Sequence, residues 1–255
     1  MSKRIAPENR IQRLLDSYPR ERPPLSEAHL AGYVDEYKIN RGGKGALYRL
    51  LTLLESWGHK RIADQQDHGD ILEIGAGTLN HVPYESETPN YDCIEPFQEL
   101  FADSPHLNRI RSMYNDIGDI PDNQLYSRII SVAVLEHLQH LPNVLAASAR
   151  HLRSNGKFQA LIPTEGGFLW GASWRLTTGI AYRLRTGLDY KTLMRHEHIN
   201  DSREIIELAG HFFSTVEISR FPLPGHHSSF YTYIEASAPN FAVVSQFLEG
   251  SKNTR

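Results

Sequence analysis

Short apolar runs and longer helix-like segments alternate along most of the chain. Seven runs of four to six residues have the length and composition of buried strands, at residues 71–74, 91–94, 109–114, 128–132, 158–162, 215–219 and 230–234. Strands that alternate with helices are typical of an α/β fold with a mostly parallel sheet. Only residues 220–229 separate the last two strands, too few for a crossover helix, so these two are predicted to pair antiparallel at one edge.

Three segments carry helix signals. Leucines at helical spacing predict an amphipathic helix over residues 45–57. Between the fourth and fifth strands, a helix is predicted to start near Pro142 and to stop at the Asn-Gly pair that ends at Gly156. Asp201, with Glu204 three residues later, has the pattern of a capping box that starts a helix before the sixth strand.

Length and composition indicate one large domain, or a domain with an appended subdomain. The 255 residues can bury one substantial core, and a net charge of -3 argues against a nucleic-acid surface or a polybasic membrane patch. The single cysteine, Cys93, cannot form an internal disulfide, which fits a reducing compartment. The charged N-terminal residues lack the apolar core of a secretory signal, and no apolar run approaches the roughly 18 residues of a membrane span. We expect a cytoplasmic protein that binds neither membrane nor nucleic acid.

Candidate chemistry begins at the end of the first strand, in the stretch DILEIGAGTLNHV. Gly75 and Gly77 would let the backbone turn tightly and approach a ligand where a Cβ atom would intrude. Glu95 lies 22 residues after Glu73, at the end of the second strand, where a carboxylate accepts hydrogen bonds from ribose hydroxyls. The alternative is a plain strand-to-loop turn with Glu95 facing solvent.

The residues after the glycines favour one cofactor class over another. A dinucleotide fingerprint needs a third glycine or alanine where this chain has Asn80. A pyrophosphate also needs a helix N-terminus, and the following stretch is short and interrupted by Pro83 and Pro89. A ligand with a sulfonium and no phosphate does not need the helix N-terminus that a pyrophosphate needs at this turn. A nicotinamide-dependent oxidoreductase is therefore the weaker alternative.

Five stretches resemble, in order, the motifs of the class I S-adenosylmethionine-dependent methyltransferases, in particular the small-molecule branch that is methyltransferase type 11-like. They are ILEIGAGTLNHV, DCIEP, YNDIGDIP, RIISVAVLEHLQHLPNVL and HLRSNGKFQALIP. The resemblance implies an α/β Rossmann-like, doubly wound sheet, mostly parallel with an antiparallel edge pair, plus a helical cap insertion. It implies S-adenosyl-L-methionine as the cofactor. It also implies a division into an N-terminal helical segment (1–67), a cofactor-binding core (68–163), an acceptor-binding cap (164–199) and the rest of the sheet (200–255).

The same resemblance assigns roles to individual positions. It implies that Glu73 holds the amino end of the methionine moiety and that the backbone of Gly75 and Gly77 flanks this moiety. It implies that Glu95 takes the ribose hydroxyls and that Asp116, with the backbone of Ile117, holds the adenine edge. The positions implied to lie near the sulfonium and the acceptor are Ala133, Val134 and His137.

One departure from the family concerns the stretch between the first two strands, which lacks a full helix. We expect the N-terminal segment or a partner chain to cover that face of the sheet. In similar methyltransferases the segment before the first strand closes over the cofactor, so Tyr37 and Arg41 are hypothesised to meet its carboxylate. The alternative is a solvated helix and turn.

The insertion at residues 164–199 is rich in aromatic and basic side chains. Aromatic rings offer a flat apolar surface, and arginine binds anions through two parallel hydrogen bonds. We predict that five of these residues bind an acceptor with a phosphate or carboxylate, such as a sugar or sugar nucleotide: Trp170, Trp174, Arg175, Arg185 and Arg195. The alternative is an amphipathic helix pair whose arginines face water.

Histidines near the fourth motif and in the HEH stretch are candidate general bases. Methyl transfer to a hydroxyl requires removal of a proton, which neutral imidazole can accept. His137 is the first choice, followed by His196 and His198, which would share a face if they lay on a strand. Structural histidines are the alternative. No spacing demands a third metal ligand, so we predict no metal.

The sequence therefore predicts an O-methyl-transferring enzyme with a small-molecule acceptor. A methyltransferase-like partner protein without catalysis stays open as an alternative, and so does a homodimer.

Overall fold

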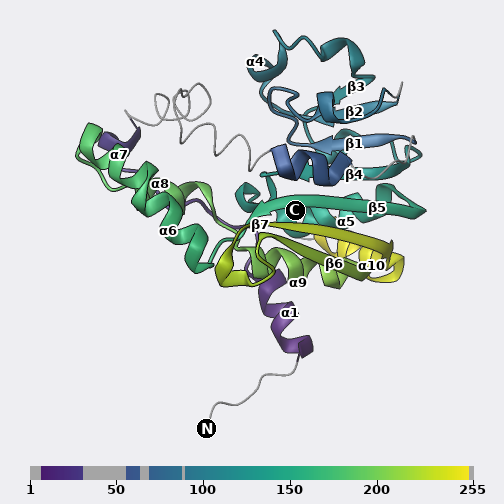
Figure 1. Ribbon diagram of the computed structural model, residues 1–255. Coiled ribbons are helices and arrows are strands. Elements are labelled where there is room, and N and C mark those ends of the chain that lie inside the picture. The colour runs from purple at the N-terminus through teal and green to yellow at the C-terminus, as the bar shows by residue number, and fades with distance from the viewer. Residues whose placement is uncertain (1–6, 31–55, 64–68, 88–89, 253–255) are drawn as a thin grey trace.

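The computed structural model describes residues 7–30, 56–63, 69–87 and 90–252 (Figure 1). Seven strands form one sheet in the order β3-β2-β1-β4-β5-β7-β6. Strands β1 to β5 are parallel, and β7 runs antiparallel to both β5 and β6, which confirms the predicted fold class. The strands are β1 (Ile71–Ile74), β2 (Tyr91–Ile94), β3 (Ser112–Tyr114), β4 (Tyr126–Val132), β5 (Leu152–Pro163), β6 (Phe213–Pro222) and β7 (Ser229–Pro239).

Every predicted strand is present, with differences at the ends. β3 begins at Ser112 rather than at residue 109, because residues 107–109 form a 3₁₀ turn. β5 begins at Leu152, directly after the preceding helix, and its pairing with β4 has an irregular register near Arg128. The Asn-Gly pair at the predicted helix stop therefore lies within this irregular first part of β5.

Helices pack on one face of the sheet and extend from its end. The helices are α1 (Pro7–Asp16), α4 (Gln98–Phe101), α5 (Leu141–His151), α6 (Phe168–Leu176), α7 (Thr178–Thr186), α8 (Tyr190–Glu197), α9 (Ser202–Phe212) and α10 (Phe241–Lys252). Short 3₁₀ helices are η1 (Val82–Tyr84), η2 (Leu107–Arg109), η3 (Ile117–Asp119), η4 (Leu135–His137) and η5 (His226–Ser228). The predicted capping box is confirmed: Asp201 accepts from the N–H groups of Arg203 and Glu204, and Glu204 accepts from the N–H of Asp201.

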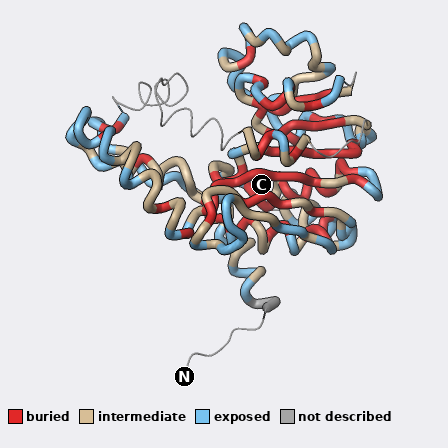
Figure 2. Tube along the Cα trace, in the orientation of Figure 1, coloured by how far each residue is buried: buried red, intermediate tan, exposed pale blue. Residues whose placement is uncertain are grey.

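The main core lies between the sheet and the helices α5, α9 and α10. Apolar side chains from β1, β4 and β5 pack there against Leu145, Leu208 and Val244 of the three helices. These side chains are almost fully buried, so the face derives its stability from removal of apolar surface from water. Figure 2 shows the result as buried strands beneath a more exposed outer layer.

A helical segment at residues 56–63 covers the opposite face, over β1 and β4 (Figure 1). Ile62 is fully buried in a second apolar cluster, and Trp57 stacks on Phe221 with ring centroids 4.7 Å apart. A Cβ atom on Gly58 would lie 2.0 Å from Cδ2 of Leu161, so only glycine permits this approach. This upstream segment, rather than the stretch between β1 and β2, therefore covers the second face. Residues 45–55 of the predicted helix lie outside the described ranges.

A fully buried arginine on β4 joins this covering segment to the loop after β1. The guanidinium of Arg128 donates to both carboxylate oxygens of Glu85 at 2.9 Å, to Gln159 at 3.0 Å and to the carbonyl of Ile62 at 2.9 Å. Burial alone would raise the pKa of Glu85, but hydrogen bonds from His81 and Arg128 outweigh it and hold this pKa at about 2. A buried charge needs such pairing, so this network fixes the loop firmly.

Helices α6, α7 and α8, together called the cap, project from the carboxyl end of β5 (Figure 1). Their side chains are mostly exposed or half-buried, in contrast with the core strands (Figure 2). Within the described ranges, the structure has no helix of the length and apolar character needed to cross a bilayer.

Candidate functional site

The turns after β1 and β4 meet at the carboxyl edge of the parallel strands. Gly75 and Gly77 have φ values of 71° and 51°, in the left-handed region that glycine adopts without strain. A Cβ atom on Gly75 would lie 2.4 Å from Cγ2 of Val134, so the turns can touch only because glycine has no side chain. The N–H of Ala133, whose φ is 54°, donates to the carbonyl of Leu161 over 2.8 Å. Backbone therefore forms this part of the edge.

Glu95 follows β2 and points back at the glycine turn. Its buried carboxylate accepts hydrogen bonds from the N–H of Gly77 at 2.8 Å and from the N–H of Phe97 at 3.1 Å. Each carboxylate oxygen keeps lone-pair capacity for a ligand hydroxyl. We call Gly75, Gly77, Glu95 and Val134 the glycine rim. The structure thus brings together residues that the sequence places up to 59 positions apart.

Three further predicted residues lie beside or below the rim. Glu73 is buried within the sheet, where the hydroxyl of Tyr91 donates to it over 2.8 Å and burial raises its pKa to about 7. Asp116 follows β3 and is exposed, and its Oδ1 accepts from the N–H of Gly118 at 2.8 Å. Ile117 is buried in the main core. Asp116 therefore continues the row of acceptor groups along the strand ends, whereas Glu73 lies beneath it.

Two histidines and two glutamates gather where β4 and β5 end. We call Glu136, His137, Glu165 and His198 the histidine–glutamate cluster. Nδ1 of His137 donates to the carbonyl of Glu197 over 2.7 Å, which leaves Nε2 as the acceptor nitrogen of the neutral ring. The rings of His137 and His198 pack edge to face at 4.8 Å, and Nδ1 of His198 lies 2.7 Å from Oε1 of Glu165.

Burial sets the charge of this cluster. It raises the pKa of Glu136, raises that of Glu165 to about 8 and lowers that of His198 to about 4. All three shifts favour the uncharged form, as expected for groups removed from water. Oε2 of Glu136 is buried and has no hydrogen-bond partner among the described residues.

Asn200 holds the cluster in place from below. Its Nδ2 donates to the carbonyls of Leu135 and Leu138, both at 2.8 Å, and so fixes η4, the turn that carries His137. Its Oδ1 accepts from the hydroxyl of Tyr18 at 2.7 Å. An N-terminal residue thus supports the position of the histidine.

Other contacts of residues 18–30 extend from the sheet to the cap. Arg20 forms a two-pronged ion pair with Glu204, at 2.7 and 2.9 Å. Further along, Nε2 of His29 lies 3.1 Å from the carbonyl of Asp189, and its ring stacks on Tyr182. We call residues 18–30 the N-terminal strap, because they contact both α9 and the cap.

His196 and His198 do not lie on a strand, so they do not share a face in the way strand residues would. Residues 190–197 form α8 and His198 follows its end, because Asp189 caps the helix by accepting from the N–H of Lys191. Nδ1 of His196 lies 2.8 Å from the carbonyl of Pro23, so only His198 joins the cluster. Within the described residues, no group of side chains is arranged to hold a metal ion.

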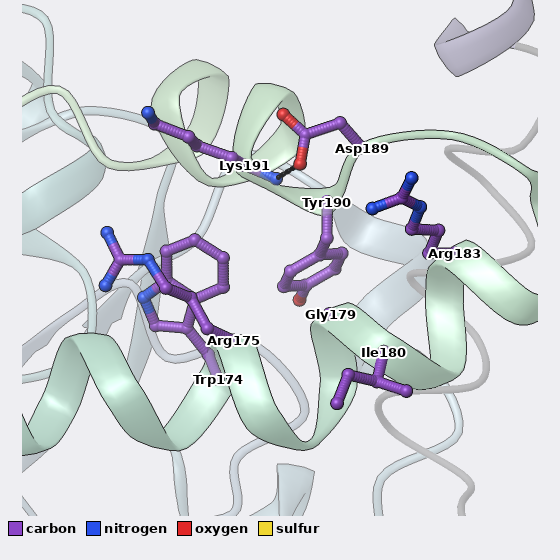
Figure 3. Close-up of a pocket in the computed structure, with 8 residues that line it drawn as sticks. All are labelled: Trp174, Arg175, Gly179, Ile180, Arg183, Asp189, Tyr190 and Lys191. Atoms are coloured by element: carbon purple, nitrogen blue, oxygen red, sulfur yellow. Dashed lines mark hydrogen bonds between the residues drawn. The ribbon is translucent and has the colours of Figure 1, made fainter.

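A pocket of about 210 Å³ lies within the cap, between the end of α6 and the starts of α7 and α8 (Figure 3). Aromatic rings and three cations line it. The lining residues are Trp174, Arg175, Gly179, Ile180, Arg183, Asp189, Tyr190 and Lys191.

The five predicted acceptor residues divide between this pocket and its surroundings. Trp174 and Arg175 line the pocket, with the guanidinium 4.4 Å from the indole centroid. Trp170 links the pocket to the cluster, since its ring lies 6.3 Å from that of Trp174 and 5.6 Å from that of His198. Arg185 lies over the ring of Tyr182, and Arg195 is exposed on α8. Neither is a lining residue.

Sequence reasoning missed several members of the site. It did not select Glu136, Glu165 or Tyr190, and it left Arg183 and Lys191 out of the five acceptor residues chosen from the insertion. Glutamates directly before His137 and His198, at positions 136 and 197, were an available signal. The predicted residues Tyr37 and Arg41 lie outside the described ranges.

A family model described as a methyltransferase domain matches residues 47–211, more than half of the chain. The chain belongs to the class I S-adenosylmethionine-dependent methyltransferases. Membership of this family excludes the alternative of a nicotinamide-dependent oxidoreductase. No curated protein matches this methyltransferase significantly.

Solved structures share its fold. A methyltransferase from Thermotoga maritima, described as a possible histamine N-methyltransferase, has 14% identity and a TM-score of 0.54 over 78% of this chain and 98% of its own. The plantazolicin methyltransferase BpumL, solved with SAH, has 11% identity and a TM-score of 0.52 over 91% and 98%. A methyltransferase from Clostridium acetobutylicum has 12% identity and a TM-score of 0.51 over 82% and 98%.

S-adenosylmethionine is the cofactor of this methyltransferase, and the residues at the strand ends fit it. At the glycine rim, Gly75 and Gly77 present backbone without a Cβ atom, and Gly75 lets the turn after β1 approach Val134 closely. Glu95 and Asp116 supply carboxylate oxygens at the ends of neighbouring strands, β2 and β3. A nucleoside needs such acceptors for its hydroxyl and amino groups.

Proposed function

We propose that this methyltransferase transfers a methyl group to a hydroxyl of a small, anionic acceptor such as a sugar or sugar nucleotide. The observation that carries the proposal is the histidine–glutamate cluster at the end of β4. His137 of this cluster follows Val134 of the glycine rim by three positions. A hydroxyl acceptor must lose its proton during transfer, and the cluster supplies a proton acceptor beside the cofactor turn.

The cofactor is proposed to lie along the strand ends. Glycine-rim backbone at Gly75 and Gly77, with Ala133 and Val134, would flank the methionine moiety, above the buried Glu73. Glu95 would accept from the ribose hydroxyls, and Asp116 with the backbone of Ile117 would hold the adenine edge. When bound, the cofactor supplies a methyl group on a positively charged sulfur.

His137 is the proposed base. Its Nδ1 proton is committed to the carbonyl of Glu197, so Nε2 is the nitrogen that can take a proton from the acceptor hydroxyl. Edge-to-face packing by His198 and the hydrogen bond to residue 197 fix the plane of the ring. Alignment of the hydroxyl oxygen with the methyl carbon and the sulfur would supply most of the remaining acceleration.

The test is acceptor-dependent formation of SAH with a panel of nucleotide sugars, with the product mapped by mass spectrometry. Because general-base catalysis contributes about 10²–10⁴-fold, His137→Ala should reduce turnover by about that factor and leave SAH affinity unchanged. Asn143→Ala, a change on α5 outside the site, is the control. Methylation of a nitrogen, or full turnover by His137→Ala, would contradict the proposal.

A further inference from the structure

The cap pocket carries an excess of positive charge. Arg175, Arg183 and Lys191 line it, and the only lining acid among the described residues is Asp189. The side chain of Asp189 caps α8 by accepting from the backbone N–H of Lys191. No carboxylate in the described part of the chain forms an ion pair with the three cations. Such a group of like charges favours an anionic ligand.

Aromatic rings lie among these cations. Figure 3 shows Tyr190 between Arg183 on one side and Arg175 with Lys191 on the other. The ring centroids of Trp174 and Tyr190 are 5.9 Å apart, and the Nε1 atom of Trp174 is buried without a hydrogen-bond partner in the described residues. Rings and cations together match a ligand with both a flat heterocycle and phosphate groups, since bases stack on aromatic side chains.

The pocket is displaced from the histidine–glutamate cluster. Lys191 lies near the start of α8 and His198 just past its end, about 10 Å apart at 1.5 Å per residue. The ring of Trp170 lies between the pocket and His198. A single small anion cannot occupy the pocket and also reach His137, whereas an extended acceptor can do both.

We propose that the cap pocket binds the nucleoside diphosphate part of the acceptor, while its sugar reaches the histidine–glutamate cluster. Arg175 and Lys191, on the same side of Tyr190 (Figure 3), would hold the diphosphate, and Trp174 with Tyr190 would contact the base. This inference rests on the proposed function and narrows its substrate class. It makes the pocket an anchor for acceptor binding, separate from the reacting atoms.

The test is calorimetric titration of the full chain with UDP, GDP, uridine, inorganic pyrophosphate and SAH. UDP or GDP should bind more tightly than either uridine or pyrophosphate alone. Arg175→Gln combined with Lys191→Gln should weaken UDP and GDP binding at least about tenfold, because hydrogen bonds to charged groups are worth about 1.5–3 kcal/mol. SAH binding should not change in that variant, and this also shows that it folds.

The matched control is Arg203→Gln, which removes an exposed cation from α9, outside the pocket. It should leave UDP and GDP binding unchanged; an equal loss would mean general charge attraction and would overturn the proposal. Pyrophosphate binding as tightly as UDP and GDP would also overturn it. Failure of both nucleotides to bind, with normal SAH binding, would overturn the anchor alone. Failure of SAH to bind would remove the proposed function and this inference together.

Discussion

The glycine rim and the cap pocket recognise their ligands with different parts of the chain. At the rim, two glycines and two backbone N–H groups define the surface, and Glu95 is held by the main chain. In the cap pocket, long exposed side chains such as Arg183 and Lys191 define the surface that a ligand would contact. A ligand common to a whole family suits a backbone site that tolerates little change. A ligand particular to one enzyme suits side chains that can be exchanged without disturbing the core.

The largest expected effect on cofactor binding comes from adding one methyl group at the rim. Gly75→Ala places a Cβ atom 2.4 Å from Val134 at a φ of 71°, so backbone and neighbour must both move. We expect SAH affinity to fall roughly 100-fold, equivalent to about 2.7 kcal/mol. The matched change in the cap is Gly187→Ala, with a φ of 74° and nothing within 4 Å. It should reduce stability by about 1–2 kcal/mol and leave SAH affinity unchanged. Equal affinity losses in calorimetry would refute the contrast.

The largest expected effect on stability comes from the buried ion pair between Arg128 and Glu85, in the loop after β1. Arg128→Met leaves the buried carboxylate of Glu85 without its cation, so the free energy of unfolding should fall by about 3–5 kcal/mol. Arg153→Met, which removes an exposed arginine paired with Asp70, should change it by less than about 1 kcal/mol. Urea denaturation measures both. Adding Glu85→Gln to Arg128→Met should restore part of the loss, and no recovery would mean that the carboxylate is not the cause.

A change at Glu95 should affect binding without affecting the fold. Glu95→Gln keeps the shape but replaces one acceptor oxygen with an amide that faces a backbone donor. We expect SAH affinity to fall about 10–100-fold, since a hydrogen bond to a charged group is worth about 1.5–3 kcal/mol. Glu87→Gln, on the exposed loop before β2, serves as the control. A normal affinity in Glu95→Gln would exclude this residue from the cofactor site.

The loop after β1, through Glu85, and the histidine–glutamate cluster, through Glu165, should make the free energy of unfolding depend on pH with opposite signs. Folding lowers the pKa of Glu85 from 4.5 to about 2, so its contribution to stability is present above pH 4.5 and lost as the pH falls towards 2. Folding raises the pKa of Glu165 from 4.5 to about 8, so the folded state binds a proton that the unfolded chain releases, and stability falls as the pH rises through that interval.

Each of these two pKa shifts should change the free energy of unfolding by roughly 1–3 kcal/mol across its pH interval. Urea denaturation between pH 3 and pH 8 measures both, at about the lower and upper ends of that range. Glu85→Gln should flatten the acidic side of the profile. Glu165→Gln should reduce the fall on the neutral side, to which the raised pKa values of Glu73 and Glu136 also contribute. A profile of Glu165→Gln that still falls from pH 5 to pH 8 as in the unchanged protein would contradict the assignment.

Local patterns were sufficient to predict the parallel sheet, the edge pairing and the capping box at Asp201. The glycine rim was also predictable, because strand ends in a parallel sheet lie at one edge and glycine spacing is a local feature. The position of the segment at residues 56–63 was not, since it depends on long-range contacts such as those of Gly58 with Leu161 and of Trp57 with Phe221. Likewise, whether His196 or His198 joins His137 depends on where α8 ends, and His198 is the residue that caps this end. Side chains that meet only after packing leave weak signals in a single sequence.

The N-terminal strap has a practical consequence for changing what the enzyme modifies. Exchanging residues 164–199 for the corresponding insertion of a relative would remove Tyr182 and Asp189, the two cap residues that His29 contacts. It would keep Tyr18 and Arg20, which are fitted to Asn200 and Glu204. A chimera should therefore carry over residues 23–30 along with the insertion, because Pro23 and His29 contact α8 and the residue before it. It should keep Tyr18 and Arg20, whose side-chain partners Asn200 and Glu204 lie outside the insertion.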